Sequence, residues 1–194
     1  MSKRDTRQLL IETGMKLMTE KGYHGVGLKE ILDSAHIPKG SFYNYFPSKE
    51  AFGAAIVEEF AAQNTVQIRT ALSDRRISAD KRLRQFYQTL RDQHKERRSK
   101  GCCLVAKLGS EVSELSPVIR SALKSACGQW LVLVAQCIRD GQIEGVFAPE
   151  IDPEALARFL HDAWEGALIR AQIEQSSAPL DNFLQHVFER LLKG

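Results

Sequence analysis

Apolar residues recur at helical spacing through almost the whole chain, and this regularity constrains the fold more than any other feature of the sequence. No stretch alternates convincingly between apolar and polar residues with the period of two that a half-buried strand requires. The 194 residues are enough for one large domain, or for one domain with a small appendage. The sequence therefore predicts an all-α protein of about nine helices.

Two short helices joined by a tight turn are predicted after a longer first helix. The first helix covers about residues 4–21 and ends at Gly22, as a left-handed C-cap would. The short helices are predicted over residues 28–34 and 39–45, on either side of a turn. This order is typical of a helix-turn-helix, in which the second short helix enters the major groove of DNA. We therefore expect duplex DNA as a partner.

The side chains of the second short helix have chemistry that suits DNA. Lys39 can bind a guanine edge or a phosphate, Gly40 lets the backbone approach, and Asn44 offers an amide. Phe42 and Phe46 are predicted to be core residues, whereas a structural role stays open for the two tyrosines. The predicted DNA-contacting residues are Lys29, Lys39, Gly40, Ser41, Tyr43, Asn44, Tyr45 and Lys49.

The charge distribution agrees with this assignment. Residues 1–49 contain eight Lys or Arg and five Asp or Glu, whereas the rest of the chain contains 19 of each kind. The whole formal net charge of +3 therefore falls in the first quarter. This asymmetry is expected when one end of a protein meets phosphates, although a solvated face with a chance imbalance stays open on charge alone.

Capping signals locate the longer helices and suggest a division of the chain. Ser48 is placed to cap a long fourth helix, and Asp152 before Pro153 reads as an N-cap with proline at the first helical position. Ser116 before Pro117 has the same form. The most polar break, SDRRISAD at residues 73–80, places a boundary near it or within the fourth helix. We predict an N-terminal three-helix DNA-binding domain over residues 1–50 and a C-terminal helical domain over residues 51–194.

The stretch from Ile11 to Phe52, above all GYHGVGLKEILDSAHIPKGSFYNYFPSKEAF, resembles the DNA-binding domain of the TetR family. The resemblance implies a transcription regulator, in most cases a repressor, with double-stranded operator DNA and a small-molecule inducer as partners. It also implies that the C-terminal domain binds the ligand and forms a homodimer through the last two helices. The chain departs from the family pattern at Gly27, His36 and Pro38, so helix two loses a hydroxyl cap.

The segment GCCLVAKLGSEVSELSP, residues 101–117, resembles a NemR-like branch of that family that responds to electrophiles. The resemblance implies that Cys103, with Cys102 beside it, is a redox or electrophile sensor. A helix N-terminus and nearby basic residues would lower the pKa of such a thiol. The alternative is that Cys103 is a small core residue, as buried thiols usually are. Cys127 and Cys137 are interpreted as packing residues.

A reversible ligand would bind between the central helices, because ligand sites in helical bundles form there. The side chains predicted to line this pocket are Phe86, Leu90, Leu108, Trp130, Val134 and Phe159.

Other functional classes find little support in the sequence. No phosphate loop, GxSxG or HExxH motif occurs, so no catalytic residue, cofactor or metal site is predicted. No apolar run approaches the roughly 18 residues of a membrane helix, and polar residues stand where a signal peptide would be apolar. We expect a cytoplasmic protein without membrane contact. A helical adaptor that binds protein partners and not specific DNA is the alternative function.

Overall fold

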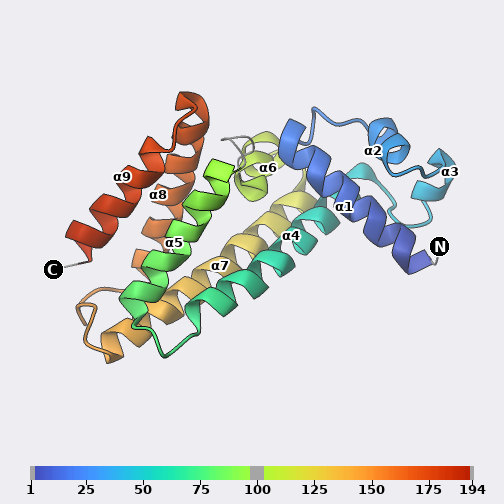
Figure 1. The fold of residues 1–194 in the computed structure, drawn as a ribbon. Helices are drawn as coiled ribbons and strands as arrows, with labels where there is room; N and C mark the ends of the chain where they lie inside the picture. The colour runs from blue at the N-terminus through green and yellow to red at the C-terminus, as the bar shows by residue number, and fades with distance from the viewer. Residues whose placement is uncertain (1–2, 97–102, 193–194) are drawn as a thin grey trace. The chain divides into compact units, whose positions relative to one another are not determined.

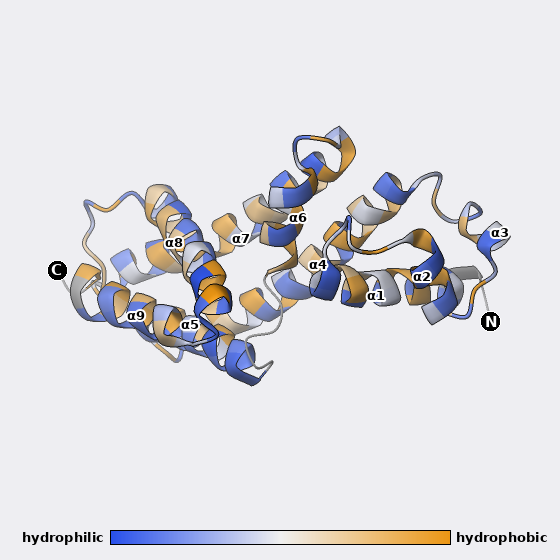
Figure 2. Cartoon of the chain, turned by 90° about the horizontal axis from the view of Figure 1, so that it is seen from above, coloured by the Kyte–Doolittle hydropathy of each residue, from blue (hydrophilic) through white to orange (hydrophobic). Residues whose placement is uncertain are grey.

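The computed structural model describes residues 3–96 and 103–192, and within them it confirms an all-α fold without strands (Figure 1). Hydrophobic and hydrophilic residues are interspersed along the helices (Figure 2), and helices α5, α6 and α9 segregate them most clearly, as expected for helices with one buried side. Across residues 3–96 and 103–192, a π-helical segment, Val187–Leu191, follows the last of nine α-helices. The α-helices are α1 (Lys3–Lys21), α2 (Leu28–Ser34), α3 (Lys39–Phe42), α4 (Lys49–Leu72), α5 (Ala79–Glu96), α6 (Leu104–Val112), α7 (Pro117–Ile143), α8 (Pro153–Glu174) and α9 (Ala178–His186).

The described chain forms two compact units that are discontinuous in sequence. The first unit consists of residues 1–63 and 103–127, and the second of residues 64–102 and 128–194. The predicted DNA-binding segment, residues 1–50, lies wholly within the first unit. That unit also contains α6, residues 49–63 of α4 and residues 117–127 of α7.

Several helix ends lie where their local signals predict. Gly22 has a φ of 79°, the left-handed conformation that ends α1. The Ser48 hydroxyl accepts a hydrogen bond from the Ala51 N–H at 3.1 Å, which caps α4. The Asp152 carboxylate accepts a hydrogen bond from the Glu154 N–H at 2.9 Å at the start of α8. These local predictions are confirmed.

Helix α3 is shorter than predicted. It ends at Phe42, and the Tyr45 N–H donates to the Phe42 carbonyl at 2.9 Å, three residues back. Residues 43–45 thus form a tight turn before Pro47 instead of continuing the helix. The predicted end at Tyr45 was wrong. A proline prevents the α-helix from extending through it, but it does not determine how many residues earlier the helix ends.

The core of the first unit depends on a close approach between α1 and α4. A Cβ on Gly14 would lie 2.5 Å from the Phe52 ring, so only glycine allows this distance. Leu10, Met18 and Ile56 are completely buried beside it. Helix α1 is therefore a fixed support for the short helices that follow.

The second unit is centred on the fully buried Tyr87 of α5. Its ring centroid lies 4.9 Å from that of Phe183 and 5.2 Å from that of Trp164. Phe86 and Trp130 contact it from α5 and α7. We call these five rings the aromatic cluster. Large aromatic side chains contribute both buried area and edge-to-face contacts, so this cluster holds α5, α7, α8 and α9 together.

The second unit also contains a buried cation, Arg82 of α5. The Arg82 guanidinium, 1% exposed, donates to the Leu72 carbonyl at 2.6 Å and to the carboxylates of Asp140 and Glu144 at 3.3 and 2.8 Å. A buried charge is tolerated only with such partners. The arginine therefore fixes the end of α4 against α5 and the end of α7.

Helix α7 is long and apolar enough, by length and composition, to cross a membrane. Its side chains Ile119, Val134 and Ile138 are completely buried in the cores of the units to which they belong. Within the described residues, 33% of its 18-residue apolar window is buried. A helix in the core of a soluble protein passes the same test of length and composition, so this single helix is weak evidence for a membrane span.

The turn between α2 and α3 carries a local strain. His36 has a φ of 55°, and the Ile37 N–H donates to the Leu32 carbonyl at 2.9 Å. The left-handed conformation costs a residue with a Cβ about 1–2 kcal/mol, whereas glycine adopts it freely. Ile37 is buried, so the turn cannot relax without exposing it.

We predict that His36→Gly raises the free energy of unfolding by about 0.5–1 kcal/mol, because relief of the left-handed strain exceeds the added entropy of an unfolded glycine. His36→Val should lower it, since a β-branched side chain fits that region poorly. Urea unfolding followed by circular dichroism measures both. A lower stability of His36→Gly would contradict the prediction.

Candidate functional site

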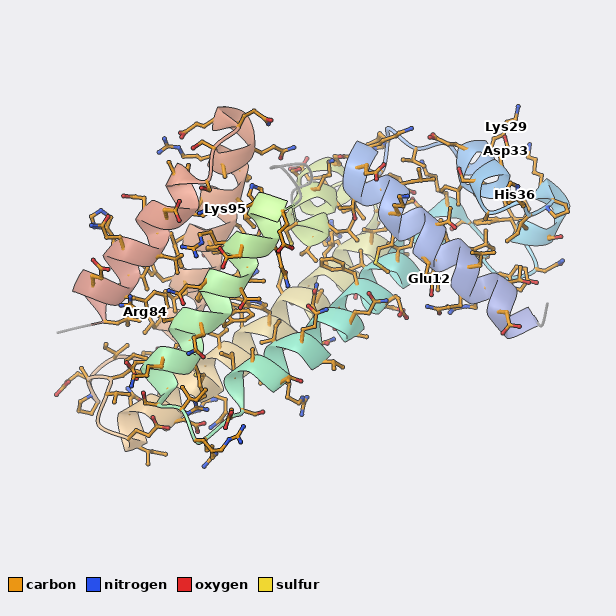
Figure 3. The ribbon with its side chains drawn as sticks, in the orientation of Figure 1. Glu12, Lys29, Asp33, His36, Arg84 and Lys95 are labelled. Atoms are coloured by element: carbon orange, nitrogen blue, oxygen red, sulfur yellow. The ribbon has the colours of Figure 1, made fainter. Side chains whose placement is uncertain are left out.

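The candidate site is the surface that α2, α3 and the turn between them present to solvent. Neither short helix has a side-chain cap, because Gly27 and Pro38 occupy the N-cap positions. Pro38 has a φ of −60° and so presets the start of α3. The labelled side chains of Lys29 and His36 lie at this end of the first unit (Figure 3).

Phenylalanine rings anchor α3 to the first unit. Phe42 is completely buried and lies 5.4 Å from the Phe52 ring, measured between centroids. Phe46 lies 4.8 Å from the same ring. The prediction that these two phenylalanines are core residues is confirmed. Their burial decides which side of α3 faces outward.

The outward side of α3 and of the turn that follows it, residues 39–45, carries most of the predicted DNA-contacting residues. Lys39, Gly40 and Asn44 are exposed, and Tyr43 is 60% exposed, so its hydroxyl is available to a partner. Ser41 and Tyr45 are half-buried, and Tyr45 packs against the core of the unit. Lys29 of α2 is also exposed. The structure thus places a lysine, an amide and hydroxyls on α3 and on the turn directly after it.

Lys49 lies differently from the other predicted contacts. Its ammonium donates to the carbonyls of Tyr23 and Val26 at 2.7 and 2.6 Å, and lies 4.4 Å from the centre of the Tyr23 ring. Burial lowers the pKa of this lysine. Since an ammonium has three donors, one remains for a phosphate. Sequence reasoning missed the link to residues 23–26 because the two carbonyls lie more than twenty positions away.

Arg7 is a further cation beside α3. Its guanidinium lies 5.2 Å from the centre of the Phe46 ring, and the side chain is exposed. Such stacking holds a guanidinium in place without using its hydrogen-bond donors. Arg7 is therefore held beside Phe46, four residues after the end of α3.

The predicted sensor thiols differ in position. Cys103 is half-buried and occupies the N-cap position of α6, with extended backbone angles. Cys102 lies outside the described residues. Cys137 is buried, and burial raises its pKa to about 12. The interpretation of Cys137 as a packing residue agrees with this burial, and Cys127 is half-buried on α7.

The predicted pocket residues belong to both units. Leu108 belongs to the buried core of the first unit, whereas the others belong to the second. Phe159 is 52% exposed, so it points away from the core of its unit. Phe86 and Trp130 do meet, with ring centroids 6.3 Å apart. Helical periodicity predicted burial for these positions but carried no information on which buried side chains become neighbours.

The aromatic cluster contains a polar group that the sequence did not identify. The hydroxyl of Tyr87 is buried and has no hydrogen-bond partner within the described part of the chain. Burial, together with the charge of Glu165, raises the pKa of Tyr87 well above its ordinary value. A neutral phenol in this place is a hydrogen-bond donor without an acceptor.

Comparisons with known proteins agree along both parts of the chain. Residues 10–56 match the family described as bacterial regulatory proteins, tetR family. Residues 79–187 match the family described as tetracyclin repressor-like, C-terminal domain. The second match alone covers more than half of the chain.

Individual relatives cover nearly the whole length. The HTH-type transcriptional repressor DhaR of Mycobacterium sp. strain GP1 is 37% identical over 99% of this chain and 95% of its own. The HTH-type transcriptional repressor NemR of Escherichia coli K12 is 36% identical over 94% and 92%. The crystal structure of reduced E. coli NemR covers 94% of this chain and 95% of its own with a TM-score of 0.89. A regulatory protein TetR from Rhodobacter sphaeroides, 37% identical, covers 94% and 96% with a TM-score of 0.86.

Proposed function

The chain belongs to the TetR family of bacterial regulatory proteins, and we propose that it is a cytoplasmic repressor that releases its operator in response to a small molecule. Like these relatives, it is a DNA-binding regulator and not an enzyme. Two copies related by a two-fold axis would place their α3 helices in half-sites about one helical turn apart. An inducer needs only a different affinity for the two arrangements of these helices.

The outward side of α3 is the observation that carries this proposal. Because Phe42 and Phe46 point inward, Lys39, Tyr43 and Asn44 face solvent together. Lysine and asparagine are suited to base edges, and a tyrosine hydroxyl is suited to a phosphate oxygen. Ser41, Tyr45, Gly40, Lys29 and the remaining donor of Lys49 would complete the contact surface.

Cys103 is the thiol that an electrophile would modify. It is half-buried at the N-cap position of α6, where backbone N–H groups favour a thiolate. Cys137 would not compete, because its raised pKa keeps it protonated. Addition to Cys103 would place a new group at the start of α6, which packs against α1 within the first unit.

A reversible inducer would meet the Tyr87 hydroxyl in the aromatic cluster. An unsatisfied buried donor costs about 1–3 kcal/mol, and a ligand that supplies an acceptor would recover that free energy. The surrounding rings favour a planar or apolar body on such a ligand.

Helix α8 is the surface that would form the dimer. Phe159, Ile169 and Ile173 are exposed on it at helical spacing, and Ile173 is 75% exposed. The apolar side chains of α9, such as Phe183 and Leu184, are instead buried within the second unit. The proposed interface through the last two helices would therefore take its apolar contacts mainly from α8.

Lys39→Gln should weaken binding to the DNA that flanks its own gene by about tenfold or more, because a base or phosphate contact is lost. Fluorescence anisotropy at several salt concentrations measures the affinity and its salt dependence. Lys81→Gln, which removes an exposed lysine of α5 in the second unit, is the matched control and should bind as the unaltered protein does. If both variants bind DNA with equal affinity, Lys39 of α3 does not contact the DNA.

N-ethylmaleimide should release the protein from that DNA and should no longer do so after Cys103→Ser. Peptide mass spectrometry at pH 8 should find the adduct on Cys103 and none on Cys137, since a thiol with a pKa of about 12 is ionised in only about one molecule in ten thousand. Cys102→Ser is the neighbouring control. Release that survives Cys103→Ser would point to another thiol or to a reversible ligand.

Ile173→Glu should turn the dimer into monomers at micromolar concentration, because the change places a charge in an apolar interface. Analytical ultracentrifugation measures the assembly state. Val132→Glu, at an exposed valine of α7, should leave the dimer intact. If both variants stay dimeric, the interface lies elsewhere.

A further inference from the structure

Helix α6 meets the end of α1 through two charged side chains that lie one turn apart. Lys107 and Glu111 are at positions i and i+4 of α6, so they share one face of that helix. Both belong to the first unit, as does all of α1. Neither residue contributes to the proposed DNA surface, and neither belongs to the aromatic cluster.

Lys107 binds the last turn of α1. Its ammonium donates to the carbonyls of Thr19 and Glu20 at 3.0 and 2.9 Å. The last carbonyls of a helix have no partners within the helix and form its negative pole, so a cation there is favourable. The lysine therefore caps α1 from outside.

Glu111 binds the turn that follows α1. One carboxylate oxygen accepts hydrogen bonds from the Tyr23 N–H at 2.8 Å and from the His24 N–H at 3.1 Å. A Cβ on Gly22 would lie 2.0 Å from the other oxygen, and Gly22 also has a positive φ. The turn thus leaves space for this carboxylate and for no side chain at position 22.

The same turn is bound from its other side by α4. Lys49, the first residue of α4, donates to the carbonyls of Tyr23 and Val26. Tyr23 therefore has its N–H on α6 and its carbonyl on α4, and Val26 stands two residues before the start of α2. The carboxylate of Glu111 also interacts electrostatically with the Lys49 ammonium. A continuous set of polar contacts runs from α6 to the starts of α2 and α4.

We propose that Lys107 and Glu111 are positioning residues that set the helix-turn-helix in its DNA-binding orientation through the turn at residues 22–26. The proposal rests on the proposed DNA-binding function and adds to it the residues that connect α6 to the DNA surface. Cys103 stands four residues before Lys107, and its carbonyl accepts the Lys107 N–H at 2.9 Å. A chemical change at Cys103 is therefore one turn of α6 away from the Lys107 contact with α1.

The first test compares operator affinities of Glu111→Ala and Lys107→Met well below their melting temperatures. We expect each variant to bind about 3- to 30-fold more weakly than the unaltered protein, the range found for positioning residues that do not touch the ligand. The dependence on salt should stay unchanged, since no phosphate contact is lost. Glu111→Gln should recover part of the affinity, because its amide oxygen still accepts the two N–H groups.

Two exposed residues of the same unit provide matched controls. Glu114→Ala and Lys124→Met remove the same charges without touching the turn and should bind operator as the unaltered protein does. Affinities of Glu111→Ala and Lys107→Met within about twofold of these controls would overturn the proposal, since a purely stabilising cap lowers the melting temperature but not the affinity of the folded protein.

Amide exchange followed by NMR tests the same connection without DNA. In Glu111→Ala, exchange should become faster at Tyr23 and His24 and also at Ile37 and Ser41 of the helix-turn-helix. Faster exchange confined to Tyr23 and His24 would show a local cap and contradict the proposal. If the unaltered protein fails to bind operator, the proposed function fails, and the exchange result still decides whether α6 controls these helices.

Discussion

The burial of Phe42 and Phe46 is the interaction on which the proposed DNA surface depends. A helix of four residues, as α3 is, is far too short to be stable by itself in water. Its conformation is held by the contacts of the two rings with Phe52 and by the turn that buries Ile37. The same burial directs Lys39 and the other polar residues outward, so one packing arrangement provides both the stability and the orientation of the helix.

How far the sequence predicts this structure depends on the distance between interacting residues. Gly22, Ser48 and Asp152 act within a few positions of themselves, and the helix ends that they predict agree with the structure. The match to the TetR family pattern likewise depends on residues that are close together in the chain. Local chemistry was thus enough for the fold class and for the outward side of α3.

Contacts between distant segments were beyond the same reasoning. Periodicity correctly marks Leu108 as buried, yet it cannot show that this leucine packs in the first unit while Phe86 packs in the second. Lys49 was interpreted only from its place at the start of a helix. Its hydrogen bonds to Tyr23 and Val26 form because the fold brings α4 back against the turn that follows α1. Lys107 contacts the last turn of α1 and Glu111 contacts the turn after it, each across 87 and 88 positions of sequence.

The aromatic cluster has a spectroscopic consequence. The chain has two tryptophans, Trp130 and Trp164, and both contact Tyr87 in the second unit. Intrinsic tryptophan emission is therefore an optical signal of that unit alone, while the helix-turn-helix is dark at the same wavelength. The protein therefore carries a built-in reporter of its second unit, and an inducer that binds at the proposed site in the cluster would change the emission without any added label.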